Sequence, residues 1–493
     1  MRRPVVLLLL LLLLPQAAQS AEEPEQRFLV IVLDGLRPDY VTEDLMPNLH
    51  ALARRGVFFE DHHAVFPTVT RVNSSSLSTG AYPETHGLMG NSVYFPEADG
   101  RRALNTSDVE NLFKIDAVTG GRLLTATTLG EVLEENGLKL LALSSGSSGS
   151  AALMNHRMTG GGVINTDVIL PEEIRADVIE AIGPAPGDSV PATARNAWVV
   201  EAYVKIGLEK LRPTVTYMWL TDPDHTAHGA GVGAPLTMDS LRGVDRDLGR
   251  ILAAHEARGL SDNVNVLVTS DHGFSTHIGG FNLSKLLRDE GLADGVTLAG
   301  GAIHVKDSPP EQIRSIVKAL QKTEWAGPIF TKAKEAGGYM GWVEGTLSFY
   351  AAHWQHERSA DILVAPMWDD GENEYGFKGR TTYAGTAGHG STSPYDIHNT
   401  LIAAGPAFVA GIRSPLPTAN TDIAPTILYV LGLESPESMT GRAMREALAG
   451  VAFDDLMQVQ QLFFRAQAGE YRVELSESYL DGRRYLNYAR VER

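Results

Sequence analysis

The 493-residue sequence contains no cysteine. Disulfide bonds, thiolate nucleophiles and thiolate metal ligands are therefore excluded. A lipid anchor attached to a cysteine after an export signal is excluded for the same reason. An exported chain without cysteines fits a bacterial periplasmic or secreted enzyme better than a eukaryotic ectodomain.

Net positive charge is also lacking. The chain has 42 Lys and Arg against 60 Asp and Glu, which gives a formal net charge of -18. An acidic surface repels phosphate backbones, so a nucleic-acid polymer is not expected as a ligand. A small phosphate ester stays possible, because bound metal ions reverse the sign of the field locally.

Long apolar runs are absent except for Val5 to Leu14, near the N-terminus. This run follows two arginines, is too short to cross a bilayer, and is followed by the small residues Ala18 and Ser20. We expect residues 1–20 to be a signal peptide, with a mature chain that is periplasmic or secreted and has no stable membrane span. An uncleaved N-terminal anchor is the alternative.

The sequence shows no internal repeats, and its length fits two to four domains or one large α/β domain with insertions. Short apolar segments alternate with amphipathic ones along most of the chain. Expected strands are Phe28 to Leu33, Leu138 to Leu143, Val215 to Leu220, Val264 to Thr269 and Asp361 to Ala365. Expected helices are Met46 to Arg54, Leu129 to Asn136, Ala194 to Leu211, Leu236 to Ala257 and Asp422 to Leu431. This alternation predicts an α/β fold with a largely parallel central sheet and helices on both faces.

Two regions depart from this rhythm. Residues 282–375 are less regular and rich in aromatic side chains, and we interpret them as a cap subdomain inserted into a catalytic domain that spans residues 21–450. Residues 451–493 form a C-terminal extension. We expect it to contain a helix from Phe453 to Ala466 and a hairpin with a turn near Asp481-Gly482.

Polar residues of metal-binding type recur where the predicted strands end. In open α/β sheets, ligands bind at this carboxyl edge. The residues are Asp34, Asp222, Asp224, His228, Asp271 and His272, with His389 in a later glycine-rich loop. Asp and His are the natural zinc ligands when cysteine is absent, and three of each suffice for two adjacent metal sites. A single Asp at a strand end is more often a turn former or helix cap, so the prediction rests on the joint pattern.

A hydroxyl nucleophile for such a site is available in the segment from Phe66 to Gly87. If Thr70 begins a helix, the backbone N–H groups there can bind a phosphoryl oxygen, and Asn73 would add a side-chain donor on the same face. Taken alone, this segment would be interpreted as a Ser/Thr-rich surface loop.

Together these segments resemble the nucleotide pyrophosphatase/phosphodiesterase branch of the alkaline phosphatase superfamily. The matching motifs, listed in chain order, are Asp34-Gly35, Pro67-Thr68-Val69-Thr70-Arg71-Val72-Asn73, Tyr82-Pro83-Glu84-Thr85-His86-Gly87, Asn91 with Tyr94, Pro223-Asp224 with His228, Asp271-His272-Gly273-Phe274, and His389-Gly390. Their order and spacing agree over roughly residues 28 to 445.

The resemblance implies a two-metal phosphodiesterase or nucleotide pyrophosphatase with an alkaline-phosphatase-like fold. Its implied ligands are Asp224, His228 and His389 for one zinc, and Asp34, Asp271 and His272 for the other, with Thr70 between the two. Thr70 would attack phosphorus to form a phospho-threonine intermediate, and Asn73 would hold a non-bridging oxygen. Other divalent metals are possible at such ligands. The substrate would be a small phosphate ester, and Arg71, Asn91 and Tyr94 are the candidate substrate-binding residues.

Some positions depart from the family pattern. Arg71 replaces the aromatic residue that usually follows the nucleophile, Asp222 replaces a glutamate, and His225 is unusual between the ligands. A sulfatase is excluded, because the Cys/Ser-x-Pro-x-Arg motif is missing.

A phosphate monoesterase or phosphonate hydrolase of the same superfamily is the main alternative. The segment from Ser144 to Asn155 has no basic residue, which favours a diester, although Arg71 or Arg157 could supply the charge that a monoester needs. A catalytically inactive, ligand-binding relative is the further alternative. The sequence does not predict the oligomeric state.

Overall fold

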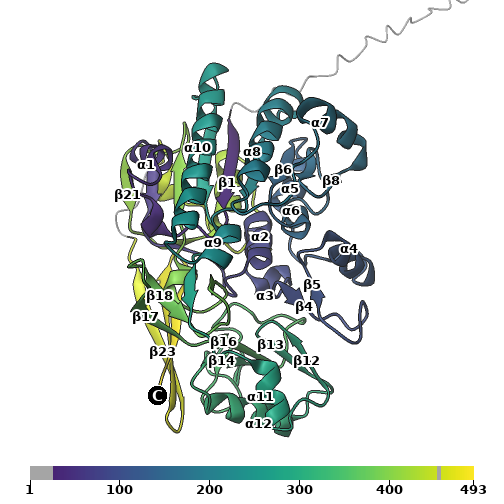
Figure 1. The fold of residues 1–493 in the computed structure, drawn as a ribbon, viewed down its shortest axis with the longest axis vertical. Coiled ribbons are helices and arrows are strands. Elements are labelled where there is room, and N and C mark those ends of the chain that lie inside the picture. Colours follow the sequence, from purple (N-terminus) through teal and green to yellow (C-terminus); the bar gives the residue numbers. More distant parts are fainter. Residues whose placement is uncertain (1–25, 452–456) are drawn as a thin grey trace, which may run out of the picture.

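The computed structural model describes residues 26–451 and 457–493, so the predicted signal peptide lies outside the described residues. A nine-stranded sheet, ordered β21-β2-β20-β10-β1-β9-β6-β7-β8, forms the centre of the molecule (Figure 1). Its strands are β1 (Arg27–Leu33), β2 (Val57–Phe59), β6 (Leu140–Ser144), β7 (Gly162–Asn165), β8 (Ile169–Leu170), β9 (Val215–Leu220), β10 (Val264–Thr269), β20 (Leu401–Ala404) and β21 (Ile412–Ser414). The contiguous strands β10, β1, β9, β6 and β7 are all parallel, whereas β20 and β8 run antiparallel to their neighbours.

The central strand β1 is buried on both faces, as its unbroken apolar run predicts. Phe28, Val30 and Val32 face one core, and the residues between them face the other. On the first face pack α2 (Thr70–Thr79), α5 (Leu129–Glu135), α6 (Ser148–Met154) and α14 (Ile423–Val430). On the second face pack α1 (Pro47–Arg54), α7 (Arg175–Ile182), α8 (Thr193–Ala202), its continuation η3 (Tyr203–Leu211) and α10 (Pro235–Ala257). The predicted α/β fold, with a largely parallel sheet between two helical layers, is therefore confirmed.

Residues 283–366 build a separate five-stranded sheet, ordered β12-β13-β16-β14-β15 and placed below the central sheet in Figure 1. Its elements are α11 (Leu283–Asp289), β12 (Val296–Ala299), β13 (Ala302–Val305), α12 (Pro310–Gln321), β14 (Ala326–Thr331), β15 (Leu347–Ser348) and β16 (Ile362–Pro366). Phe349 and Trp354 are buried in its core, and Trp354 Nε1 donates a hydrogen bond to the carbonyl of Met89. The second sheet is thereby attached to the segment that follows α2 and α3 (Pro83–His86).

A further, four-stranded sheet is ordered β17-β18-β11-β19. It consists of β11 (Ser275–His277), β17 (Trp368–Glu372), β18 (Lys378–Thr381) and β19 (Ala387–Gly388). Further elements are α4 (Val109–Val118), α9 (Asp224–Ala230), α13 (Pro394–Ile397), β3 (His62–His63) paired with β22 (Thr418–Ala419), and β4 (Ser92–Val93) paired with β5 (Leu104–Asn105).

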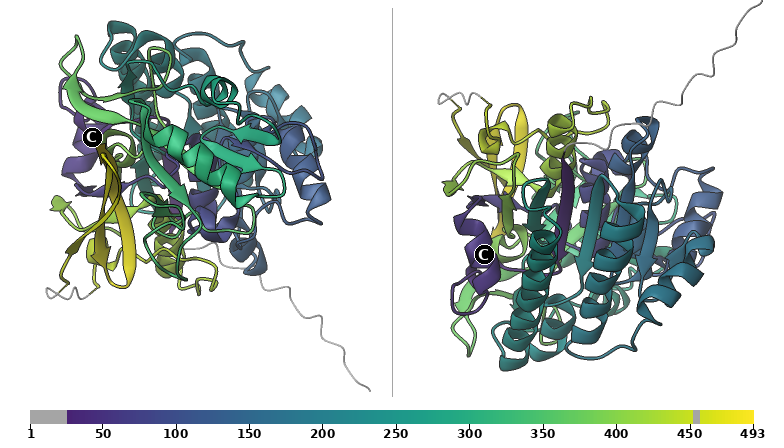
Figure 2. Two further views of the ribbon diagram at one scale, coloured as in Figure 1. Left: turned by 90° about the horizontal axis from the view of Figure 1, so that it is seen from below. Right: turned by 90° about the horizontal axis from the view of Figure 1, so that it is seen from above.

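The C-terminal extension is a three-stranded antiparallel sheet of β23 (Gln460–Ala468), β24 (Tyr471–Leu480) and β25 (Arg483–Glu492), drawn in yellow along one side of the molecule in Figure 2. The predicted hairpin and its turn at Asp481-Gly482 are confirmed. The helix predicted from Phe453 to Ala466 is wrong in its second half, which is strand β23, whereas residues 453–456 lie outside the described residues. Exposed and half-buried side chains alternate along β23, which is a period of two rather than 3.6. Phe464, for example, stacks on Tyr339 at 3.4 Å between ring centroids.

Within residues 26–451 and 457–493, no helix is long and apolar enough to cross a membrane.

Candidate functional site

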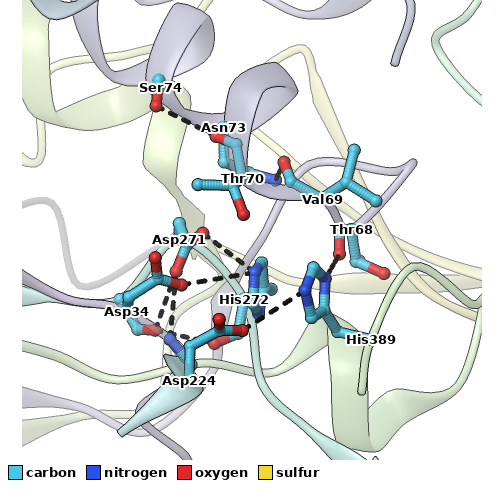
Figure 3. Close-up of polar contacts among 12 residues, drawn as sticks. Asp34, Thr68, Val69, Thr70, Asn73, Ser74, Asp224, Asp271, His272 and His389 are labelled. Carbon is cyan, nitrogen blue, oxygen red and sulfur yellow. Dashed lines mark hydrogen bonds and ion pairs between the residues drawn. The ribbon is translucent and has the colours of Figure 1, made fainter. Parts of the chain in front are cut away.

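Three carboxylates and three imidazoles come together at the carboxyl edge of the parallel strands. Asp34 follows β1, Asp224 begins α9 just after β9, and Asp271 with His272 follows β10. His228 lies one turn further along α9, and His389 directly follows β19. The topology therefore brings together all six predicted metal ligands, from segments up to 355 positions apart in the sequence. Figure 3 labels all of them except His228.

Asp224 is at the centre of this cluster. Its Oδ1 atom lies 3.3 Å from Nε2 of His228 and 3.3 Å from Nε2 of His389. The ligand atoms of Asp34, Asp224 and His272 form a second group, in which all atoms lie within 4.8 Å of one another. Nε2 of His272 is 2.9 Å from Oδ2 of Asp271 and 3.6 Å from Oδ1 of Asp34. Asp224 thus belongs to both of the adjacent ligand groups.

Each imidazole is held by a backbone carbonyl at its Nδ1 atom. His228 is hydrogen-bonded to Ala387 O at 3.0 Å, His272 to Gly273 O at 2.9 Å, and His389 to Thr68 O at 2.8 Å. Because a carbonyl only accepts, the neutral rings carry their proton on Nδ1 and keep the Nε2 lone pair free. This is the usual way in which proteins orient a histidine toward a metal ion.

Two of the carboxylates are fixed in a similar way, through one oxygen each. Trp219 Nε1 donates to Asp34 Oδ2 at 2.9 Å, and the Gly35 N–H donates to Asp271 Oδ1 at 3.1 Å. Gly35 adopts a φ of +74°, and a Cβ there would lie 3.2 Å from the Cβ of Asp224, so this position favours glycine.

The second oxygens have no hydrogen-bond partner. Among the described residues, buried atoms without one include Asp34 Oδ1, Asp224 Oδ1, Asp271 Oδ2 and His272 Nε2. Unpaired buried carboxylate oxygens are costly, and bound cations remove that cost. The donor set of Asp and His matches zinc and related divalent ions, so these residues fit a two-metal site.

The electrostatics of the cluster also indicate that a cation is needed. Burial and the neighbouring Asp271 and Asp224 raise the pKa of Asp34 well above its usual range. Burial opposes ionisation of Asp224 as well, but His228 and His389 hold its pKa well below the usual range. Three carboxylates at this separation repel one another unless positive charge lies between them.

Zinc binding is expected to strengthen as the pH rises. Although burial favours the neutral ring, Asp224 raises the pKa of His228 to about 9, so the metal-free protein carries a proton on His228 at pH 7. Zinc must displace that proton, and the apparent affinity should increase by up to about tenfold per pH unit between pH 6 and 9. Competition with a chromogenic chelator measures this, and an affinity that does not change over that range would contradict the assignment of His228.

Thr70 is the first residue of α2 and is 6% exposed. Its hydroxyl points toward the carboxylates of Asp34 and Asp271 in Figure 3. The positive end of the helix dipole faces the same cluster, which favours a bound anion there. The segment that we would otherwise have interpreted as a surface loop is thus a buried helix, in which Ser74 Oγ donates to the carbonyl of Thr70 at 3.0 Å.

The structure does not support the role predicted for Asn73. Its side chain is fully buried, and its Nδ2 donates to the carbonyls of Val65 and Val69 at 3.0 and 3.3 Å. Its Oδ1 accepts from the Val65 N–H at 2.8 Å. Because both amide hydrogens are in use, Asn73 anchors the start of α2 and has no donor left for a substrate oxygen.

Asn91 and Arg71 lie at the start of α2. Asn91 Oδ1 accepts a hydrogen bond from the Arg71 N–H at 3.0 Å, one residue after the nucleophile candidate. The Arg71 guanidinium interacts electrostatically with all three carboxylates of the cluster, and burial lowers its pKa. Its Nε has no hydrogen-bond partner within the described part of the chain. Both residues therefore lie beside Thr70 at the start of α2.

Tyr94 lies in a different place. Its hydroxyl donates to Gly100 O at 3.3 Å, and its ring packs edge-on against His304 of the second sheet at 5.2 Å. It lines a hollow of about 980 Å³ whose wall includes Arg122, His304 and Arg358 but none of the six ligand residues. Arg157 is also engaged elsewhere, since it donates to Gly121 O and pairs with Glu131.

Several site residues could not be singled out from the sequence. In the sequence, Trp219 looks like any aromatic residue of a buried strand, but its Nε1 hydrogen bond orients the side chain of Asp34. Asn420 donates to Asp271 O at 3.1 Å and to Asn73 Oδ1 at 3.0 Å. One side chain therefore connects the ligand-bearing loop after β10 to the start of α2. Asp222, which follows β9 like a ligand, instead accepts hydrogen bonds from Ala192, Asn196 and Thr226.

Comparison with known protein families decides which chemistry this site belongs to. Residues 28–388 match the family model described as type I phosphodiesterase / nucleotide pyrophosphatase. The chain belongs to this family. It is accordingly a metal-dependent hydrolase of phosphoric esters, and the resemblance noted from its motifs is confirmed.

Relatives of this phosphodiesterase include the bis(5′-adenosyl)-triphosphatase of mouse (Mus musculus), which is 25% identical over 422 residues, covering 84% of this chain and 79% of the relative. The human protein of the same name is 24% identical over 422 residues, with 84% and 80% covered. A venom phosphodiesterase of the cobra Naja atra is 29% identical over 248 residues, which is 50% of this chain and 26% of that protein.

Among solved structures, murine ectonucleotide pyrophosphatase/phosphodiesterase 5 is similar to this phosphodiesterase with a TM-score of 0.62 at 20% identity, covering 86% of this chain and all of the other. A threonine-to-alanine variant of that murine protein, described as inactive and in complex with AMP, is similar with a TM-score of 0.61 at 20% identity, over 86% of this chain and 100% of the other. These similarities support the fold.

Proposed function

We propose that this enzyme hydrolyses phosphate diesters, including nucleotide diesters. Thr70 is the nucleophile, and the cofactors are two divalent metal ions, which we expect to be zinc. The observation that supports this most directly is the position of Thr70, at the N-terminus of a buried helix, with its hydroxyl pointing toward the carboxylates of Asp34 and Asp271. The murine relative whose threonine-to-alanine variant is described as inactive is consistent with a threonine nucleophile.

The residues divide into two ligand sets. Asp224, His228 and His389 would hold one ion, and Asp34, Asp271 and His272 the other, with the Thr70 hydroxyl between them. Bound there, the metal ions would lower the pKa of the attacking hydroxyl and of water, and offset the charge on the phosphoryl oxygens.

The reaction has two displacements at phosphorus. In the first, Thr70 Oγ forms a bond to phosphorus, its proton passes to solvent, and the bond from phosphorus to one alcohol oxygen breaks. That alcohol leaves with a proton from water, and the second alcohol stays on the phosphorylated Thr70. In the second, water attacks the same phosphorus, and the bond to Thr70 Oγ breaks.

Asn91 and Arg71 bind the substrate during these steps. The Arg71 N–H holds the carboxamide oxygen of Asn91, which leaves the NH₂ group of Asn91 to donate to a non-bridging phosphoryl oxygen. The Arg71 guanidinium adds positive charge on the same side. Tyr94, whose hydroxyl and ring are engaged by Gly100 and His304, is not part of this set.

The second sheet would cover the metal cluster and determine which leaving groups the enzyme accepts. Its Arg358 donates to Gly87 O and Leu123 O, and its His353 stacks on Tyr82 at 4.1 Å between ring centroids. These contacts hold residues 283–366 against the segment that follows α2, which supports this role.

A comparison of three substrates tests this proposal. We expect the zinc-loaded enzyme to hydrolyse bis(p-nitrophenyl) phosphate and thymidine 5′-p-nitrophenyl phosphate at least about a hundredfold faster than p-nitrophenyl phosphate, in kcat/KM. Protein treated with a chelator is the control, and it should be inactive on all three. A monoester that is hydrolysed fastest would contradict the diester preference.

Phosphate monoester hydrolysis is the second candidate, and the buried Arg71 beside the carboxylates is the observation that favours it. A monoester carries one more negative charge, and Arg71 is the cation placed to bind it. In that case Arg71→Met would abolish monoester turnover and leave diester turnover within about tenfold. The engagement of Arg157 by Gly121 and Glu131 leaves Arg71 as the basic residue for this role.

The enzyme would act in the periplasm or outside the cell, after removal of residues 1–20. The apolar run near the N-terminus and the absence of cysteine support this location. Fractionation of cells that express the full chain, with N-terminal sequencing of the product, tests it.

A further inference from the structure

A third group of ligand side chains lies outside the catalytic cluster. It consists of Asp61, His63 on β3, and His398 just after α13. The Asp61 Oδ1 atom is 3.5 Å from His63 Nε2 and 3.4 Å from His398 Nδ1. A backbone bridge between His63 and His398 fixes the two histidines side by side, with their ring centroids 4.6 Å apart.

The spacing of these atoms matches that of the catalytic ligands. In both groups one carboxylate oxygen serves two histidines, at 3.5 and 3.4 Å here and at 3.3 and 3.3 Å around Asp224. Ligand atoms bound tetrahedrally to zinc at ~2.0–2.1 Å lie ~3.3–3.4 Å apart. The distances from Asp61 to the two histidines therefore match those expected between ligands of one zinc ion.

A fourth side chain reaches His63 from the C-terminal sheet. Asn487 Oδ1, on β25, is 3.0 Å from His63 Nε2 and also accepts a hydrogen bond from Ser478 Oγ at 3.1 Å. The Asn487 NH₂ group donates to Gln461 Oε1 at 3.0 Å and to Ser476 Oγ at 3.2 Å, which fixes the orientation of the carboxamide. His63 Nδ1 lies 2.8 Å from the carbonyl of Thr418, so the neutral ring has its proton there and its lone pair on Nε2.

Oxygen and nitrogen atoms of four side chains thus gather at one place. A cation bound between them would offset the charge of Asp61 and accept the lone pairs of both histidines. We propose that Asp61, His63, His398 and Asn487 bind a divalent metal ion of the zinc type, separate from the two catalytic ions. All four positions are filled by protein, which is typical of a structural rather than a catalytic site.

This metal ion would join three parts of the chain that are far apart in the sequence: β3 beside the central sheet, the end of α13, and the C-terminal strand β25. The His63 side chain is 2% exposed, whereas Asp61 and His398 are 28% and 29% exposed, so an ion can reach the site from solvent. The role is to fix the C-terminal sheet to the catalytic domain. The inference is independent of the phosphodiesterase mechanism.

The zinc content of purified, full-length protein tests it. We expect Asp61→Asn and His398→Ala each to lose one zinc per chain relative to wild type, with kcat for a diester within about twofold of wild type. His228→Ala should also lose zinc but should lose activity with it, which separates the two kinds of site. His50→Ala, on α1, is the matched control and should keep the wild-type zinc content.

Wild-type zinc content in both Asp61→Asn and His398→Ala would overturn the proposal, because the acceptors would then share a proton instead of a metal ion. A second measurement needs no variant. Anomalous diffraction at the zinc edge from zinc-loaded wild-type crystals should show a peak bounded by Asp61 Oδ1, His63 Nε2 and His398 Nδ1. Peaks at the catalytic cluster without one at this position would overturn the proposal equally.

Discussion

Thr70→Ala is expected to lower kcat/KM for an aryl phosphodiester by on the order of 10⁴-fold or more, while the zinc content stays at the wild-type value. The reason is that Thr70 supplies the atom that attacks phosphorus but only completes a ligand set that six other side chains provide. Steady-state kinetics and metal analysis of the same preparation measure the two quantities.

Two further variants make this test specific. Thr70→Ser keeps the hydroxyl and should recover much of the activity. Ser74→Ala removes a hydroxyl one turn later in α2, where it bonds to the carbonyl of Thr70, and should stay within about tenfold of wild type. Equal losses in Thr70→Ser and Thr70→Ala would show that the hydroxyl is not the nucleophile.

Asp224→Asn is expected to lower both zinc content and activity, the latter by on the order of 10³-fold. Asp224 belongs to both ligand groups, and its Oδ1 is the atom nearest to His228 and His389. An amide keeps the size of the side chain but removes the charge that two metal ions need. Excess zinc should restore chelated wild type fully and should not restore the variant.

Asp222→Asn is the matched control for this prediction. Asp222 follows the same strand but accepts hydrogen bonds from Ala192, Asn196 and Thr226, so its replacement should lower the melting temperature and leave the zinc content unchanged. If Asp224→Asn keeps the wild-type zinc content and activity, Asp224 is not a metal ligand.

The sequence predicted β1, β6, β9 and β10 at the middle of the central sheet, because buried parallel strands are short apolar runs, but it did not predict β2, β7, β8, β20 or β21. The expected strand Asp361 to Ala365 is β16 of the second sheet. The bounds of β9 and β10 agree residue for residue with the runs Val215 to Leu220 and Val264 to Thr269. The convergence of Asp34, Asp224 and Asp271 followed from the same reasoning, since parallel strands end at one edge. The strand β23 was missed because its alternation becomes clear only beside its partner β24.

The polar network around the ligands was not predictable in this way. The groups that orient His228, His272 and His389 are backbone carbonyls. Every residue has such a carbonyl, so the residue types do not indicate which ones take part. Asn73 was assigned to the substrate because it lies three residues after Thr70. Its actual partners are backbone groups of Val65 and Val69, and the path of the loop before α2 brings them to Asn73. The pair His62–His63 also gave no signal, since its companions Asp61, His398 and Asn487 become neighbours only in the fold.

The stereochemical course at phosphorus tests the central claim most directly. Each in-line displacement inverts phosphorus, so attack by Thr70 followed by attack by water gives net retention. The measurement uses a single diastereomer of a nucleoside phosphorothioate diester, hydrolysed in ¹⁸O-labelled water, with the configuration of the product determined by ³¹P NMR. We predict retention. Inversion would show that water displaces the leaving group in one step, without a covalent intermediate on Thr70.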